Sequence, residues 1–169
     1  VFYMTEQEYD VIVVGSGAAG MVAALTAAHQ GLSTVVLEKA PHYGGSTARS
    51  GGGVWIPNNE VLRRDGVKDT AEAARTYLHA IIGDVVPAEK IDTYLERGPE
   101  MLSFVLEHSP LKLCWVPGYS DYYPETAGGK PTGRSVEPKP FDAKRLGPDE
   151  KGLEPPYGKV PLNMVVLQQ

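Results

Sequence analysis

Short apolar runs alternate with glycine-containing turns over the first forty residues. One apolar run extends from Tyr9 to Val14 and a second from Ser33 to Glu38, with an alanine-rich stretch from Ala18 to Gln30 between them. Short runs that are apolar on both faces are typical of buried parallel strands. Gly31, directly after the alanine-rich stretch, is typical of the end of a helix. The pattern therefore predicts a buried βαβ unit over residues 9–38 with a right-handed crossover.

Further along the chain, polar residues indicate where helices begin. Asn58 or Asn59 begins a short helix through Arg64, and Asp69 with Glu72 has the spacing of a capping box for a longer helix. The apolar pattern also predicts a pair of helices and then a strand, at residues 87–97, 99–108 and 111–116.

The composition changes at Pro117. Prolines and glycines are frequent from there to Gln169, which argues against long helices and central strands in this segment. Aromatic residues in and beside it are more frequent than is typical of disorder, namely Trp115, Tyr119, Tyr122, Tyr123, Phe141 and Tyr157. We therefore expect an ordered segment that covers another part of the protein.

Charge and cysteine content narrow the function class. The net charge of −5 argues against a nucleic-acid partner, because phosphate binding needs a clustered basic surface. The single cysteine, Cys114, cannot form an internal disulfide, which favours a reducing compartment. Its apolar neighbours indicate a buried residue.

The run from Val11 to Leu37 lacks charged residues, but glycines interrupt it, so we interpret it as strand, helix and strand rather than a membrane span. No metal site is indicated, because Cys and His residues do not occur at ligand spacing.

The turn after the first strand carries a nucleotide-binding motif. Gly15, Gly17 and Gly20 match G-x-G-x-x-G between a predicted strand and a predicted helix. In this motif the first glycine makes a tight turn, the second lets the backbone approach a pyrophosphate, and the third lets helix and strand pack closely. Glu38, at the end of the second strand, can accept hydrogen bonds from ribose hydroxyls, and its charge disfavours the 2′-phosphate of NADP.

The residues after Glu38 favour FAD over NAD. The stretch from Gly44 to Gly53 is a glycine-rich loop with hydroxyls at Ser46, Thr47 and Ser50, which suits close contact with a large flat ring system. A plain NAD-binding domain and a mobile linker are the alternatives, since glycine and serine also form flexible chain.

Three stretches of the chain resemble a known family. They are "YDVIVVGSGAAG", "VVLEKAPHYGGSTARSGGGVWIPNN" and "WVPGYSDYYPE", which are similar to the N-terminal part of the 3-ketosteroid Δ1-dehydrogenases. Those flavoproteins belong to the group related to fumarate reductase and succinate dehydrogenase, and they are several times longer than this chain. The resemblance implies an α/β fold in which a Rossmann-like FAD-binding βαβ unit is followed by helices and a Pro/Gly-rich segment that covers the active site, together an incomplete domain.

The resemblance also implies a reaction. In that family FAD takes a hydride from C1 of a 3-ketosteroid and a tyrosine takes a proton from C2, which creates a C1–C2 double bond in ring A during steroid catabolism. Tyr122 best matches an active-site tyrosine that supports the proton-abstracting one, and Tyr119 and Tyr123 match it less well. The base itself lies in later sequence of the family, so the isolated chain is expected to be inactive.

The same resemblance assigns parts of the chain to the cofactor and the substrate. Residues 1–116 form the N-terminal part of the FAD-binding domain, with the βαβ unit at 9–38, the flavin loop at 44–54 and helices to residue 108, and residues 117–169 lie near the substrate. The implied cofactor-binding residues are Gly15, Ser16, Gly17, Ala18, Ala19, Gly20, Glu38, Lys39, Ala40, Gly45, Ser46, Thr47, Ser50, Gly51, Gly52, Gly53 and Val54.

The implied partners are a 3-ketosteroid substrate and an electron acceptor such as a quinone. We expect a cytoplasmic location, with peripheral membrane association as an open alternative because steroids are apolar. Two alternative functions stay open. One is a related FAD enzyme, either another steroid dehydrogenase or a fumarate-reductase-like enzyme, and the other is a non-catalytic nucleotide-binding fragment.

Overall fold

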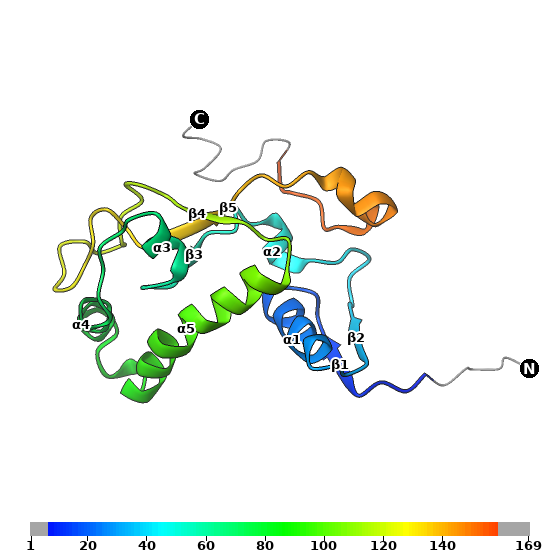
Figure 1. The fold of residues 1–169 in the computed structure, drawn as a ribbon, viewed down its shortest axis with the longest axis horizontal. Coiled ribbons are helices and arrows are strands. Elements are labelled where there is room, and N and C mark those ends of the chain that lie inside the picture. The colour runs from blue at the N-terminus through cyan, green and yellow to red at the C-terminus, as the bar shows by residue number, and fades with distance from the viewer. Residues whose placement is uncertain (1–6, 159–169) are drawn as a thin grey trace, which may run out of the picture. The chain divides into compact units, whose positions relative to one another are not determined.

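The computed structural model describes residues 7–158, which combine helices with two small sheets in an α/β arrangement (Figure 1). The last part of the expected segment 117–169 therefore lies outside the described residues. The described chain forms two compact units. The first contains the residues up to Ser50 and those from Asp142 onward, and the second contains Gly51–Phe141.

The first unit begins with the predicted βαβ arrangement. It consists of β1 (Val11–Val14), α1 (Ala18–His29) and β2 (Thr34–Leu37). The strands pair in parallel, with Val11 opposite Thr34 and Val14 opposite Leu37, and α1 lies beside them (Figure 1). Gly31 ends the helix as expected, since its φ is +82° and its N–H donates to Ala28 O at 3.0 Å.

The expectation that this unit is buried on both faces is wrong for the described residues. Val13 is buried beside Gly20 of α1, but Ile12 is 60% exposed and Val14 is 84% exposed. Side chains alternate along a strand, so Val13 points to the face covered by the helix and its two neighbours point to the other face. A single crossover helix covers only one face of a two-stranded sheet.

The glycine-rich stretch is not an irregular loop throughout, because it contains a short helix, α2 (Gly45–Arg49). Gly44 precedes it in the left-handed region with a φ of +107°, and Ala48 N–H donates to Gly44 O at 3.1 Å. The later part of the first unit contributes a kinked 3-10 helix, η2 (Ala143–Gly152). Beyond η2, Leu153 forms a parallel bridge with Tyr43, so this segment lies against the residues that lead into α2.

The second unit combines helices with an antiparallel sheet. Its elements are β3 (Val54–Trp55), α3 (Glu60–Arg64), α4 (Ala71–Ile82), η1 (Gly83–Val85), α5 (Ala88–His108), β4 (Leu113–Trp115) and β5 (Ser135–Pro138). The strand order is β3-β5-β4, so β5 is central, contrary to the expectation that the Pro/Gly-rich segment holds no central strand. The prolines do not interrupt β5, since Pro138 is its last residue and pairs only with β4.

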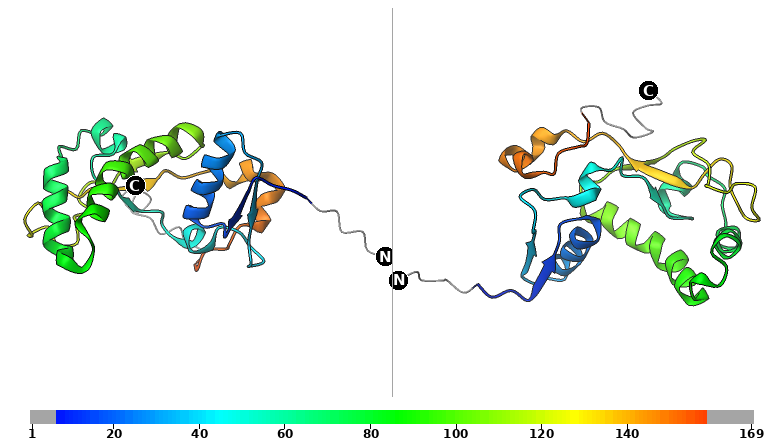
Figure 2. Two further views of the ribbon diagram at one scale, coloured as in Figure 1. Left: turned by 90° about the horizontal axis from the view of Figure 1, so that it is seen from below. Right: turned by 180° about the vertical axis from the view of Figure 1, so that it is seen from behind.

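The core of the second unit lies between its helices and its sheet. The larger apolar cluster contains Ile56, Val61, Leu62, Leu102, Leu113 and Val136. A smaller cluster of Tyr77, Leu78 and Ile91 joins α4 to α5, which pack against each other (Figure 2). The expected strand near Cys114 is β4, and Cys114 itself is half-buried. Burial raises the pKa of its thiol, which suits an unreactive residue.

Two polar helix caps were predicted, and the structure agrees with one of them. Asn59 caps α3, because its side chain accepts a hydrogen bond from Leu62 N–H at 3.0 Å. The cap of α4 is Thr70 rather than Asp69, and its Oγ1 accepts from Ala73 N–H at 3.0 Å. The Asp69 carboxylate pairs instead with a buried arginine that comes 65 residues later in the chain.

The two helices expected at residues 87–97 and 99–108 form one continuous helix, α5. Pro99 lies inside it, although proline lacks the N–H that would bond to the preceding turn. Buried apolar side chains on both sides of the proline, Ile91 and Leu102, anchor the helix to the two clusters. Tertiary packing therefore outweighs the local cost of the proline.

Candidate functional site

The turn between β1 and α1 depends on backbone contacts that suit glycine alone. Gly15 has a φ of +96°, and its N–H donates to Leu37 O of β2 at 2.7 Å. A Cβ on Gly20 would lie 1.9 Å from Gly15 O, so helix and loop meet backbone to backbone. This geometry agrees with the tight turn and the close packing that the dinucleotide motif requires.

The N-terminus of α1 has the properties of an anion site. Gly17 is the N-cap, and no acidic residue lies in the first turn. A Cβ on Gly17 would have only Thr47 Oγ1 within 4 Å, at 3.7 Å. Thr47 Oγ1 accepts from Ala18 N–H at 3.0 Å, while the next N–H groups of the turn have no helical carbonyl to bond. Bare N–H groups and the positive end of the helix dipole suit the pyrophosphate of a dinucleotide.

Glu38 lies directly after β2 and closes the same loop. One of its oxygens accepts from Ser16 N–H at 3.0 Å and from the Ser16 hydroxyl, and the other accepts from Ala40 N–H at 2.9 Å. Ser16 in turn accepts from Gly44 N–H at 2.8 Å, which joins the loop to α2. The hydrogen bonds from Ala40 and Ser16 lower the pKa of Glu38 to about 2, so it is an anion with acceptor capacity to spare for ribose hydroxyls.

This depressed pKa predicts an acid-sensitive first unit. The ordinary pKa of 4.5 falls to about 2 in the folded protein, so the Glu38 contribution is fully present above pH 4.5 and is lost as the pH falls toward 2. We expect the urea midpoint of the wild type to fall more steeply over this interval than that of Glu38→Gln, which has no carboxylate to titrate. The hydrogen bonds from Ser33 also lower the pKa of Asp10, but this carboxylate titrates in both proteins and contributes equally to both pH profiles. If the urea midpoints of the two proteins fell in parallel, the prediction would be contradicted.

Residues 149–157, here called the α2 clasp, bind the residues on both sides of Gly44. Tyr43 N–H donates to Gly152 O and Glu154 N–H donates to Tyr43 O, both at 2.8 Å. The Tyr43 hydroxyl donates to Asp149 O at 2.7 Å. Through these bonds the clasp fixes the chain that leads into α2, and with it the position of Thr47 against the α1 N-terminus.

The clasp also determines where Arg49 points. Arg49 pairs with Glu154, donates from Nε to Pro155 O at 3.2 Å and lies 4.6 Å over the ring of Tyr157. The hydrogen bond with Tyr157 is the largest cause of the raised pKa of Arg49, burial opposes it, and the charge of Glu154 raises the pKa further. The cation of the glycine-rich stretch is therefore held by the clasp. No pattern within residues 44–53 could have indicated these partners, which come more than a hundred residues later.

The other predicted cofactor residues fall into two groups. The first group lies in the first unit. Ala19 is in the first turn of α1, Lys39 comes directly after Glu38, and Gly45, Ser46 and Ser50 are in and beside α2. Those that lie in the second unit are Gly51, Gly52, Gly53 and Val54. Gly52 packs there on Pro138 of β5, with a φ of +78°, and Val54 begins β3.

Tyr122 also lies in the second unit, in the turn-rich segment between β4 and β5. Its side chain is 84% exposed. The neighbouring Tyr119 hydroxyl interacts with it, and the Tyr122 phenol is the main cause of a raised pKa at Tyr119. Tyr123, the third candidate, is half-exposed, and its N–H donates to Tyr77 Oη at 3.2 Å.

Comparison with known proteins identifies the family to which this geometry belongs. The model of the FAD binding domain family matches residues 10–162, which include the glycine loop, Glu38 and α2. The chain belongs to the FAD-binding domain family. FAD is thus the cofactor, as the glycine-rich stretch after Glu38 indicated, and the loop, the bare helix N-terminus and the Glu38 carboxylate suit it.

Relatives within this FAD-binding family are more specific. The chain is 89% identical over its full length to 3-oxosteroid 1-dehydrogenase of Mycolicibacterium smegmatis, and covers 30% of that protein. Among solved structures, the 3-ketosteroid Δ1-dehydrogenase of Sterolibacterium denitrificans matches 88% of this chain at 44% identity with a TM-score of 0.82, over 26% of its own length. The 3-ketosteroid Δ4-(5α)-dehydrogenase of Rhodococcus jostii RHA1 matches 82% at 26% identity with a TM-score of 0.64, over 32% of its length.

These matches confirm the resemblance to 3-ketosteroid dehydrogenases and the Rossmann-like start of the fold. The chain spans about a third or less of the length of these relatives. None of the helices in the described part of the chain is long and apolar enough to cross a bilayer. Within residues 7–158, His, Cys, Asp and Glu side chains form no group of three or more that could hold a metal ion.

Proposed function

We propose that the complete protein carrying this chain is an FAD-dependent 3-oxosteroid 1-dehydrogenase, which introduces a C1–C2 double bond into ring A of 3-ketosteroids. The observation that carries the proposal is the 89% identity, over every residue of this chain, to the M. smegmatis enzyme of that name. The S. denitrificans relative was solved in complex with 1,4-androstadiene-3,17-dione, which supports a 3-ketosteroid as the substrate class.

In this proposal the first unit binds the ADP half of the cofactor. The first turn of α1, from Gly17 to Gly20, holds the pyrophosphate, and Glu38 accepts from the ribose hydroxyls. Residues 45–54 lie along the remainder of the cofactor, as the resemblance implied. When bound, FAD would supply the acceptor for the hydride that leaves C1 of the steroid. The chain's own contribution is to hold the cofactor through the bare N–H groups of the α1 N-terminus and to disfavour a 2′-phosphate through the acidic ribose partner.

Tyr122 has the supporting role at the substrate. The neighbouring ketone acidifies the C2–H bond, and a base supplied elsewhere in the complete protein removes that proton. A phenol that donates a hydrogen bond to the base stabilises its anionic form, so the proton is removed more readily. The exposure of Tyr122 supports this role, because its phenol can reach a partner outside the described residues.

The test uses the full-length protein purified with FAD. We expect androst-4-ene-3,17-dione to be converted to the 1,4-diene, with loss of two hydrogens detected by mass spectrometry and reduction of a dye acceptor. Tyr122→Phe should lower kcat by about 10- to 100-fold, less than the roughly 10²–10⁴-fold contributed by a group that transfers the proton itself, because Tyr122 only supports the base. Tyr123→Phe, a change to the adjacent half-exposed tyrosine, is the matched control and should leave kcat near the wild-type value.

Two outcomes would point to the alternatives. Conversion of a 5α-reduced steroid with no reaction of the 4-ene would favour a dehydrogenase acting at another ring bond, like the R. jostii relative. Reduction of fumarate by the dithionite-reduced protein, without steroid turnover, would favour a reductase.

A quinone as electron acceptor and a cytoplasmic or peripheral membrane location belong to the same proposal. An assay in which a quinone replaces the dye acceptor tests the first, and cell fractionation tests the second.

A further inference from the structure

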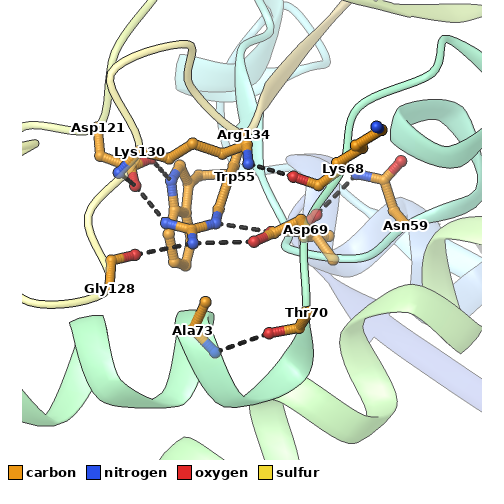
Figure 3. Close-up of polar contacts among 11 residues, drawn as sticks. Trp55, Asn59, Lys68, Asp69, Thr70, Ala73, Asp121, Gly128, Lys130 and Arg134 are labelled. Atoms are coloured by element: carbon orange, nitrogen blue, oxygen red, sulfur yellow. Dashed lines mark hydrogen bonds and ion pairs between the residues drawn. The ribbon is translucent and has the colours of Figure 1, made fainter.

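A buried arginine in the second unit connects four separate parts of the chain (Figure 3). The Arg134 side chain is 1% exposed and forms a bidentate pair with Asp69, at 2.7 and 2.9 Å. It also pairs with Asp121 and donates to Gly128 O at 2.9 Å. Its guanidinium lies 5.7 Å from the Tyr77 ring and 5.9 Å from the ring of Trp55. These residues are called the Arg134 network below.

Within the Arg134 network, Asp121 is the member that adjoins Tyr122. Its carboxylate is fully buried and accepts from Trp55 Nε1–H at 2.8 Å, from Lys130 N–H at 2.9 Å and from Arg134. On the other side of Tyr122, the N–H of Tyr123 donates to the hydroxyl of Tyr77 at 3.2 Å. The residues before and after Tyr122 are thus both fixed to the network, while the Tyr122 side chain itself is exposed.

Stability alone does not explain this arrangement. A buried arginine with two carboxylates stabilises a fold no more than well-packed apolar residues of the same volume do, because all three charges lose their hydration. Such groups can instead impose one conformation, since each hydrogen-bonding direction has to be satisfied. The segment that this network orders is a short, turn-rich one with few apolar side chains to hold it.

We infer that Arg134 and Asp121 are positioning residues that hold the backbone of Tyr122 at a fixed place for the dehydrogenation. The inference rests on the role proposed for Tyr122. Its physical basis is that the Asp121 carboxylate and the Tyr123 N–H, on either side of Tyr122, are both hydrogen-bonded to the network, which sets the path of the backbone between them. A hydrogen bond between two catalytic phenols weakens steeply with displacement, so a shift of about 1 Å at such a group can cost on the order of 100-fold in rate.

The test compares Asp121→Asn with Asp69→Asn in the full-length protein. Both changes remove one buried carboxylate partner of Arg134, but only Asp121 adjoins Tyr122. We expect Asp121→Asn to lower kcat by about 10- to 100-fold with FAD content unchanged, and Asp69→Asn to lower thermal stability with kcat near that of the wild type. In the Tyr122→Phe background, Asp121→Asn should have no further effect on kcat, because both changes act through one hydroxyl.

Equal losses of kcat in the two Asn variants, or an undiminished effect of Asp121→Asn in the Tyr122→Phe background, would overturn the inference. Tyr77→Phe provides a milder variant should Asp121→Asn fail to fold, since it removes only the acceptor for Tyr123 N–H and keeps the ring. Amide hydrogen exchange separates this inference from the proposed function. Faster exchange at residues 121–123 in Asp121→Asn than in Asp69→Asn is expected whatever the substrate, and unchanged exchange would refute the positioning role even in an active enzyme.

Discussion

Replacing Gly20 by alanine is expected to abolish FAD binding and to unfold the first unit. The added Cβ would lie 1.9 Å from Gly15 O and 3.3 Å from Cγ1 of Val13, so it would meet the loop backbone and a buried strand side chain at once. Backbone cannot rotate away as a flexible side chain can. We therefore expect the free energy of unfolding to fall by an amount at or above the upper end of the about 1–3 kcal/mol that is typical of overpacking. The measurements are the flavin absorbance retained after gel filtration and the urea unfolding curve.

Gly17→Ala is the matched control in the same loop. A Cβ there would approach only Thr47 Oγ1, at 3.7 Å, and the φ of −70° is open to any residue. The fold should therefore survive, while the methyl group stands where the pyrophosphate approaches the N-terminus of α1. We expect a wild-type unfolding midpoint with FAD affinity at least about tenfold lower. Unfolding of Gly17→Ala, or retention of flavin by Gly20→Ala, would reverse the roles assigned to the two glycines.

The parts of the fold that were predicted correctly from the sequence are those governed by local rules. The βαβ unit follows from apolar runs of strand length, the end of α1 follows from the left-handed conformation open to Gly31, and the cap of α3 follows from a side-chain acceptor at Asn59. The glycine motif belongs to this class as well, because its spacing is a property of one turn. Each of these features is decided within a few residues along the chain.

The features that were missed depend on residues distant in sequence. Asp69 has the spacing of a helix cap, but a buried arginine outcompetes the helix N-terminus for its carboxylate, and Thr70 becomes the cap. Pro99 has the sequence signature of a helix end, yet packing on both sides keeps α5 continuous. The partners of Arg49 likewise come from the α2 clasp, so the cation within the expected cofactor loop is already paired with Glu154.

Replacing Arg134 by methionine is the second change for which we expect a large effect, and it acts on the second unit. Methionine fills a similar volume, so the main loss is the cation that two buried carboxylates share. Breaking a buried ion pair by removing one partner costs about 3–5 kcal/mol, because the remaining charge is left without compensation. We expect a loss of that size in the free energy of unfolding, measured in urea. The affinity for FAD should fall less than the stability does, because the cofactor is bound by the first unit.

A compensated variant tests whether uncompensated charge is the cause. In Arg134→Met with Asp69→Asn and Asp121→Asn, no ionised group of the triad remains, so the variant should be more stable than Arg134→Met alone although it carries two more substitutions. If the triple variant is instead less stable, the hydrogen bonds that the Asp121 carboxylate accepts from Trp55 and from Lys130 N–H matter more than charge. The two outcomes assign different roles to the same residues. Recovery by the triple variant means that electrostatic balance holds the unit together, whereas further loss means that hydrogen-bond direction holds the chain around Tyr122 in place.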